Sequence, residues 1–188
     1  MSFDIEAITW DNEKRKNRAK VIAEEINKAI PIQKKWNALE FGCGTGDLCR
    51  LLNDYHPAKY VGVDIAKFAI DYAIDSNENE NVKFKNINIL FEDIGKYDLV
   101  ITSNTLEHFK NPYVVIDRLL SIGDKLLMLL PYNEIELLDK YDCEGGAGHV
   151  FSFTENSFSN YEIIDWYTFY TPEWAMPPEP LQLVILIK

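Results

Sequence analysis

The sequence predicts an α/β fold in which parallel strands are followed by an antiparallel pair, and three observations carry this prediction. Short apolar runs alternate with helical patterns as far as residue 130, which is typical of a parallel sheet with right-handed crossovers. A glycine-rich turn joins the first strand to the next helix. The β-rich stretches 159–170 and 181–188 have no helical pattern between them, so they should pair antiparallel.

The first element is a helix that Asp11 or Asn12 could cap, with apolar residues at helical spacing up to Ile30 and a stop at Pro31. Its basic run 14–20 is interpreted as a solvated face. Three later helices are predicted: one begins at Leu48, one covers 67–76 and one begins at Pro112. Apolar runs predict the strands, which are a run that ends at residue 41 and the runs 60–64, 82–84, 97–102 and 125–130. We expect one domain, 1–188, with a helical lid segment 1–36, a core 37–130 and a C-terminal part 131–188.

The composition limits the classes of function. The chain has 188 residues, 47% of them hydrophobic, and a net charge of −11, so it should be globular and should not bind nucleic acid. Three cysteines form no metal-type pair and no disulfide framework, so we expect no metal site. We also expect the protein to be located in a reducing cytoplasm. We expect no signal peptide and no membrane span. A monomer and a homodimer both remain open.

The turn after the first strand is the most specific motif. Glu40 is followed by glycines at alternate positions, Gly42, Gly44 and Gly46, where a Cβ would clash with a ligand that comes close to the backbone. A nicotinamide-binding turn needs Gly-x-Gly-x-x-Gly, and here the third glycine is one position too early. Asp47 and Glu40 would also disfavour a pyrophosphate. This pattern argues against a nucleotide-dependent oxidoreductase.

Asp64 ends the second predicted strand, eighteen residues after Gly46, where a carboxylate can bind both hydroxyls of a ribose. Together with the glycine turn, it makes the sequence resemble the class I S-adenosylmethionine-dependent methyltransferases of small molecules. The resemblance implies a Rossmann-like seven-stranded sheet, with five parallel strands, a C-terminal antiparallel pair whose last strand is inserted, and helices on both faces. It implies S-adenosylmethionine as cofactor and S-adenosylhomocysteine as product.

The resemblance also implies which residues bind the cofactor. At the adenine, the family often has an acidic residue where this chain has Asn88, whose side-chain oxygen could accept the same bond. Asn88 is otherwise a turn residue, and the backbone at Ile89 could serve the adenine instead. The full set expected to bind the cofactor is Glu40, Gly42, Gly44, Gly46, Asp64, Ile65, Asn88, Ile89 and Ser103.

The acceptor side is predicted from two segments that carry histidines. The Leu-Glu-His phrase ending at His108 is similar to the segment after the fourth strand in small-molecule methyltransferases, and a later glycine-rich loop delivers His149. We favour His149 as catalytic base or substrate contact and His108 as the second candidate, although either could be structural. Trp10 and Tyr132 are candidates for the walls of the acceptor pocket, and Trp10 could instead pack against the fold.

The predicted reaction is methyl transfer to a small molecule, at a hydroxyl or another heteroatom. Alignment of the two reactants supplies much of the barrier reduction, and a base adds roughly 10²–10⁴-fold only where the acceptor is a hydroxyl. A catalytic histidine is therefore optional. The alternative is a catalytically inactive S-adenosylmethionine-binding module or a partner subunit.

Overall fold

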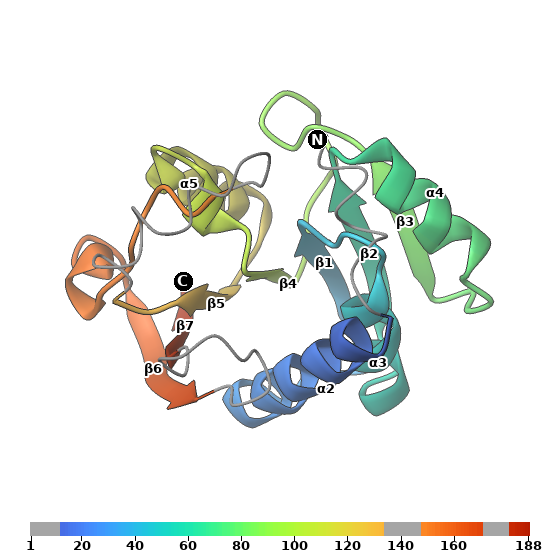
Figure 1. The fold of residues 1–188 in the computed structure, drawn as a ribbon, viewed down its shortest axis with the longest axis horizontal. Helices are drawn as coiled ribbons and strands as arrows, with labels where there is room; N and C mark the ends of the chain where they lie inside the picture. Colours follow the sequence, from blue (N-terminus) through green and yellow to red (C-terminus); the bar gives the residue numbers. More distant parts are fainter. Residues whose placement is uncertain (1–11, 134–147, 171–180) are drawn as a thin grey trace.

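A seven-stranded sheet forms the centre of the computed structural model, which describes residues 12–133, 148–170 and 181–188. The strand order is β3-β2-β1-β4-β5-β7-β6 (Figure 1). Strands β1 to β5 are parallel, and β7 runs antiparallel between β5 and β6. The predicted fold class is confirmed, including the insertion of the last strand into the sheet.

The elements have bounds close to those predicted. In chain order they are α2 (Asn12–Ala29), β1 (Asn37–Phe41), α3 (Asp47–Tyr55), β2 (Lys59–Asp64), α4 (Lys67–Asp75), β3 (Val82–Asn86), β4 (Leu99–Ser103), the 3₁₀ helix η1 (Leu106–His108), α5 (Pro112–Ile122), β5 (Leu126–Pro131), the 3₁₀ helix η3 (Glu155–Phe158), β6 (Ile163–Tyr170) and β7 (Leu181–Ile187). Strand β5 is buried along its whole length, as its continuous apolar sequence predicts for a strand covered on both faces.

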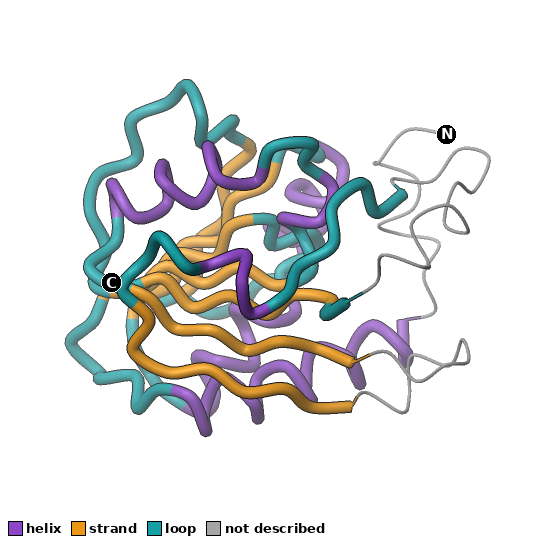
Figure 2. Tube along the Cα trace, turned by 90° about the vertical axis from the view of Figure 1, so that its left-hand side faces the viewer, coloured by secondary structure: helices purple, strands orange, loops and turns teal. Residues whose placement is uncertain are grey.

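Helices cover both faces of the sheet (Figure 2). Each face has its own apolar core. On one face, α2, α3 and α4 pack residues such as Ile26, Leu52 and Ile70 against the strands. On the other, α5 contributes Ile116 and Leu119. In the part of the chain that the structure describes, no helix is both long and apolar enough to cross a membrane.

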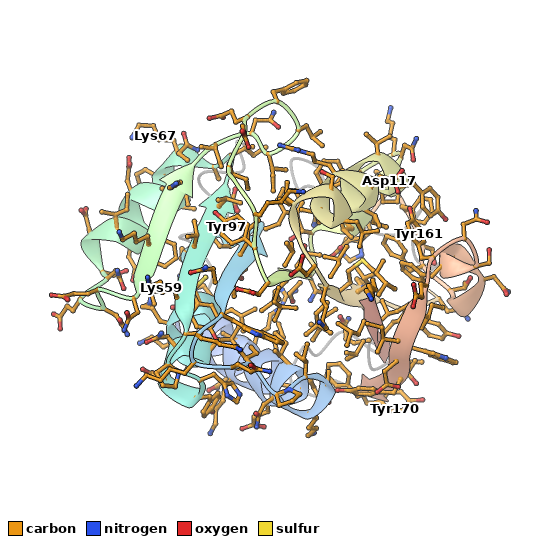
Figure 3. All side chains as sticks on the ribbon, turned by 180° about the vertical axis from the view of Figure 1, so that it is seen from behind. Lys59, Lys67, Tyr97, Asp117, Tyr161 and Tyr170 are labelled. Carbon is orange, nitrogen blue, oxygen red and sulfur yellow. The ribbon has the colours of Figure 1, made fainter. Side chains whose placement is uncertain are left out.

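Strand β6 begins at Ile163, four residues later than predicted, because the preceding segment has its own local structure. The 3₁₀ helix η3 is preceded by its cap residue Thr154, whose backbone N–H donates to Ser157 Oγ at 3.0 Å. The Tyr161 hydroxyl then donates to Asp117 Oδ1 of α5 at 2.9 Å, and Figure 3 shows the two side chains next to each other. This contact holds the segment against α5 before the strand begins.

Two strand ends also differ from the prediction. Tyr97 forms only an isolated bridge with Gly123, so β4 begins at Leu99. Pro131 was predicted to stop β5, yet it is the last residue of the strand, where it lies opposite Gln182 of β7. Proline is tolerated there because a strand end can omit one donor without breaking the ladder.

Candidate active site

The candidate active site is a cavity of about 410 Å³ at the carboxyl ends of β1, β2 and β4, where ligands bind in open parallel sheets. Its walls come from the glycine turn, the ends of these strands, helix α2 and the segment 148–151. The lining residues are Arg15, Arg18, Ala19, Ile22, Glu40, Gly42, Cys43, Gly44, Thr45, Asp47, Leu48, Asp64, Ala66, Ala69, Ser103, Asn104, Glu107, His108 and His149. The structure therefore brings together most of the predicted cofactor residues and both predicted histidines.

The three glycines of the turn have different reasons to be glycine. All three have positive φ, with values of 74°, 51° and 77° for Gly42, Gly44 and Gly46. A Cβ on Gly42 would lie 2.3 Å from Thr105 Oγ1, and one on Gly46 would lie 2.3 Å from the Phe84 ring. A Cβ on Gly44 would meet no described atom within 4 Å and would project into space that the cavity provides. Gly42 and Gly46 therefore permit close packing, whereas Gly44 leaves room for a ligand.

The Asp64 carboxylate organises the side of the cavity that contains the glycine turn, named the cofactor half here after its predicted ligand. It accepts hydrogen bonds from the backbone N–H of Gly44 at 2.9 Å and from that of Ala66 at 2.8 Å. A carboxylate can accept about four hydrogen bonds, so two more donors, such as the hydroxyls of a ribose, can be bound. The Asp64 side chain thus ties the glycine turn to the end of β2 and lines the cavity.

Asp47 is more heavily paired than the sequence indicated. Its carboxylate contacts Arg15 Nε at 2.5 Å and Arg50 at 2.9 Å, and it accepts the Thr45 hydroxyl at 2.8 Å. Two guanidinium groups compensate one carboxylate, so Asp47 disfavours an anionic ligand less than we argued from the sequence. The case against a nicotinamide cofactor then rests on the glycine spacing.

Glu40 is a carboxyl group with an unusual environment, being only 4% exposed at the end of β1. Its pKa is raised from 4.5 to about 8, mainly by burial and also by the negative charges of Asp47 and Asp64, although hydrogen bonds with Cys49 lower it. Its Oε2 accepts no hydrogen bond from any residue that the structure describes. Because Glu40 lines the cavity, an ammonium or hydroxyl group of a ligand would supply the missing donor.

Helix α2 contributes two arginines that the sequence analysis did not assign to the site. Arg15 and Arg18 line the cavity, and Arg15 also lies over the Tyr72 ring at 5.4 Å. The interpretation of the basic run as a solvated face is thus wrong for these two residues. They are seven and four positions before Ile22, which is buried in the cavity-facing core, so helical spacing could have placed them on the inner face.

The side of the cavity that contains the two histidines, named the acceptor half here after its predicted ligand, is built around Glu107, which is 0% exposed. Its Oε1 lies 3.8 Å from His149 Nε2 and 4.0 Å from His108 Nε2. The two imidazoles meet edge to face with centroids 5.2 Å apart. Two histidines forty-one positions apart in the chain therefore converge on one buried carboxylate.

Backbone contacts hold these side chains together. The N–H groups of Val150 and Phe151 donate to the carbonyl oxygen of Glu107 at 2.8 and 3.1 Å. His108 Nδ1 lies 3.3 Å from the carbonyl oxygen of Gly148. Glu107 also interacts with Arg18, whose pKa is lowered to about 10 by burial and raised by the nearby carboxylate.

Several predicted residues lie apart from the cavity. Ile65 is 61% exposed, and Ile89 is buried with its carbonyl oxygen accepting Arg118 Nε at 2.9 Å. The Asn88 side-chain oxygen accepts the N–H of Leu90 at 3.1 Å, as in a turn, and its role at an adenine stays a prediction. Trp10 and residues 142–147 of the glycine-rich loop lie outside the described residues. The predicted residues that do not line the cavity are Gly46, Ile65, Asn88, Ile89 and Tyr132.

Comparison with known families identifies the chain. The sequence model of the family described as "Methyltransferase domain" matches residues 14–165. The chain belongs to this methyltransferase family. The match includes the glycine turn, Asp64 and both histidines of the cavity.

Curated relatives match part of the chain. It is 38% identical over 81 residues to malonyl-[acyl-carrier protein] O-methyltransferase of Acetivibrio thermocellus, covering 42% of this chain and 29% of that protein. It is 32% identical over 123 residues to the mitochondrial ubiquinone biosynthesis O-methyltransferase of Dictyostelium discoideum, covering 56% and 38%. The alignments thus span less than half the length of these relatives.

Solved structures share the fold over nearly the whole chain. One is the methyltransferase in a complex with the Haloferax volcanii Trm112 methyltransferase activator, with a TM-score of 0.81 and 11% identity, covering 99% of this chain and 96% of that one. Another is magnesium protoporphyrin IX methyltransferase from Synechocystis with bound S-adenosylhomocysteine, with a TM-score of 0.71 and 16% identity, covering 100% and 88%.

Proposed function

We propose that this protein binds S-adenosylmethionine and transfers its methyl group to a small-molecule acceptor, at a hydroxyl or another heteroatom. The single observation that carries the cofactor assignment is the cavity wall formed by Gly44 and Asp64. It combines an open position over a positive-φ glycine with a carboxylate that can accept further hydroxyl donors. Glu40 adds a buried oxygen suited to a ligand cation.

The residues present fit this cofactor at both of its ends. Asp64 would hold the ribose hydroxyls, and Glu40 would face the cationic, methionine-derived part, where Ser103 and Asn104 also line the cavity. Asn104 Nδ2 donates to Ser103 Oγ at 3.0 Å, which fixes both side chains at the end of β4. When bound, S-adenosylmethionine supplies a methyl group on a sulfonium, a good leaving group.

The acceptor half provides groups that could take a proton. A hydroxyl acceptor loses its proton as its oxygen accepts the methyl group, and His149 or His108 could receive it if the hydroxyl lies within hydrogen-bond reach. Their position beside the buried Glu107 would stabilise the resulting imidazolium. The proposal of an oxygen acceptor is also consistent with the curated relatives, both of which are named O-methyltransferases.

The alternative function is a binding module or partner subunit that holds the cofactor without transferring its methyl group. One structural neighbour was solved together with an activator protein. If this chain resembled it in that respect, cofactor binding alone would be observed and turnover would require a second protein.

The experiment has two steps that separate these functions. Calorimetry should show saturable binding of S-adenosylhomocysteine and none of NAD. A turnover assay should then detect S-adenosylhomocysteine formed from S-adenosylmethionine with a panel of phenols, alcohols, carboxylic acids and amines. Gly44→Val serves as the control that lacks the cofactor site. Binding without turnover on any acceptor would favour the module, and no binding at all would overturn both.

A further inference from the structure

The geometry points to a second ligand in the cavity: we propose that Glu107, His108 and His149 bind one divalent transition-metal ion of the zinc class. The three residues each offer a ligand atom, and these atoms all lie within 4.8 Å of one another. The set comprises two imidazoles and one carboxylate, a combination that suits zinc and neighbouring first-row metals rather than calcium or magnesium. The sequence analysis expected no metal because it considered only the cysteines.

The tautomer of His108 is the first argument. Its Nδ1 lies 3.3 Å from the Gly148 carbonyl oxygen, which can only accept a hydrogen bond. The proton of the neutral ring is therefore on Nδ1, and Nε2 presents a lone pair. A histidine that donates one ring N–H to a backbone carbonyl and offers the other nitrogen is the usual arrangement of a metal ligand.

The second argument is what this lone pair faces. His108 Nε2 lies 4.0 Å from Glu107 Oε1, and His149 Nε2 lies 3.8 Å from the same oxygen. Arg18 already lies near this carboxylate, and a metal ion between Glu107 and His108 would be ligated by both groups. The alternative is a proton on Nε2, which makes an imidazolium.

The third argument is the rigidity of the framework. Glu107 and His108 belong to η1, and the N–H groups of Val150 and Phe151 bind the Glu107 carbonyl oxygen, which fixes His149 beside it. Zinc ligands at bond lengths of about 2.0–2.2 Å lie roughly 3.3–3.5 Å apart in a tetrahedral site. Side-chain rotations that move the ligand atoms by about 1 Å would reach this geometry without changing the backbone.

The place of the cluster indicates what such an ion would do. All three residues line the cavity, and three protein ligands leave at least one coordination position open to it. An open position is typical of a site that binds a small-molecule oxygen, unlike a closed structural site. Arg18 also lies near Glu107 and repels a dication, so we expect weaker binding than at a closed structural zinc site.

The test is a metal titration of the full chain, freed of any histidine tag and treated with a chelator. Calorimetry with Zn²⁺ should give one site per chain with release of protons, and Co²⁺ should give visible absorption bands of a nitrogen- and oxygen-ligated ion. His149→Ala and Glu107→Gln should each weaken binding at least roughly 10–100-fold, the loss seen even for residues that only support a ligand. The matched control is His56→Ala, whose imidazole contacts Asn27 away from the cavity, and it should bind as the wild type does.

Since Glu107 is fully buried, thermal unfolding must first show that Glu107→Gln folds; the wild-type titration and His149→Ala do not depend on it. The proposal is overturned if the wild type shows no saturable binding below about 100 µM. It is equally overturned if His56→Ala loses as much affinity as His149→Ala, which would mean an adventitious ion only. In either case the proton, and not a metal, balances Glu107. Because every readout is metal binding, failure here leaves the proposed methyl transfer untouched.

Discussion

The cofactor half and the acceptor half of the cavity are built in different ways. The cofactor half consists mainly of backbone: the turn 42–46 and Asp64 are joined by bonds from main-chain N–H groups, all within one strand–turn–helix–strand unit. The acceptor half consists of side chains from three distant segments, namely α2, η1 and residues 148–151. Ligand binding at a site formed by backbone should therefore depend on whether a single added Cβ fills the space of the ligand. Binding at a site formed by side chains should depend on their charges.

The largest expected effect on the cofactor half comes from Gly44→Val. The new side chain would occupy the cavity, so binding of S-adenosylhomocysteine measured by calorimetry should be abolished while the protein remains folded. The matched control is Gly95→Val, since Gly95 also has positive φ and open space around its Cβ position but does not line the cavity. Both variants carry a similar backbone strain of about 1–2 kcal/mol, and only the first should lose binding. Normal binding by Gly44→Val would show that the turn is purely structural.

Glu40 gives the next largest effect, on stability. Burial raises its pKa from 4.5 to about 8, so between these pH values the folded chain holds a proton that the unfolded chain has lost. The stability associated with this group is therefore present at low pH and is lost as pH rises. Relative to Glu40→Gln, which does not titrate, the free energy of unfolding of the wild type should fall by roughly 3 kcal/mol from pH 5 to pH 7.

Denaturant unfolding of both proteins across this pH range measures the difference. Parallel stability profiles would mean that Glu40 titrates normally. Repeating the series with saturating S-adenosylmethionine sharpens the comparison, because a ligand cation beside Glu40 should favour its charged form and reduce the difference.

Asp64→Ala tests the charged side chain that is proposed to hold the ribose. It removes the acceptor for the proposed ribose hydroxyls as well as the bonds to Gly44 and Ala66. Affinity for S-adenosylhomocysteine should fall by roughly 1–3 kcal/mol in calorimetry. Asp71→Ala is the control, since Asp71 pairs with exposed Lys67 on α4 and does not line the cavity. Equal affinities of the two variants would remove Asp64 from the site.

The smallest effect on cofactor affinity is expected for His149→Ala. His149 belongs to the acceptor half, so the dissociation constant of S-adenosylhomocysteine should change less than about twofold, within the scatter typical of independent sites. Once an acceptor is known, turnover should fall by roughly 10²–10⁴-fold if His149 is the base. A loss of cofactor affinity without a change in turnover would contradict this assignment, because it would place His149 at the cofactor and not at the acceptor.

Sequence patterns predicted more residues of the backbone-built half than of the side-chain-built half. Glycine spacing and a carboxylate at a strand end are local signals, and both Gly44 and Asp64 line the cavity. Arg15 and Glu107 were missed as site residues because their roles depend on contacts between segments far apart in the chain. Local patterns also could not show that Asn88 is occupied within its own turn, or that Ile65 stays exposed.

The fold was predictable for a related reason. Alternating strands and helices predict parallel pairing, and the missing helix between the last two β stretches predicts their antiparallel pairing. The strand ends were less certain, because Tyr161 and Pro131 act through partners in other elements, Asp117 and the strand β7.

The position of β7 between β5 and β6 has a consequence for the order in which the sheet can assemble. Strand β6 pairs with β7, which comes later in the chain, so β6 can join the sheet only after residues 181–187 have taken their place beside β5. Until then β6, including Trp166, is a strand without a neighbour, and its unpaired backbone groups are open to chaperones or to another chain.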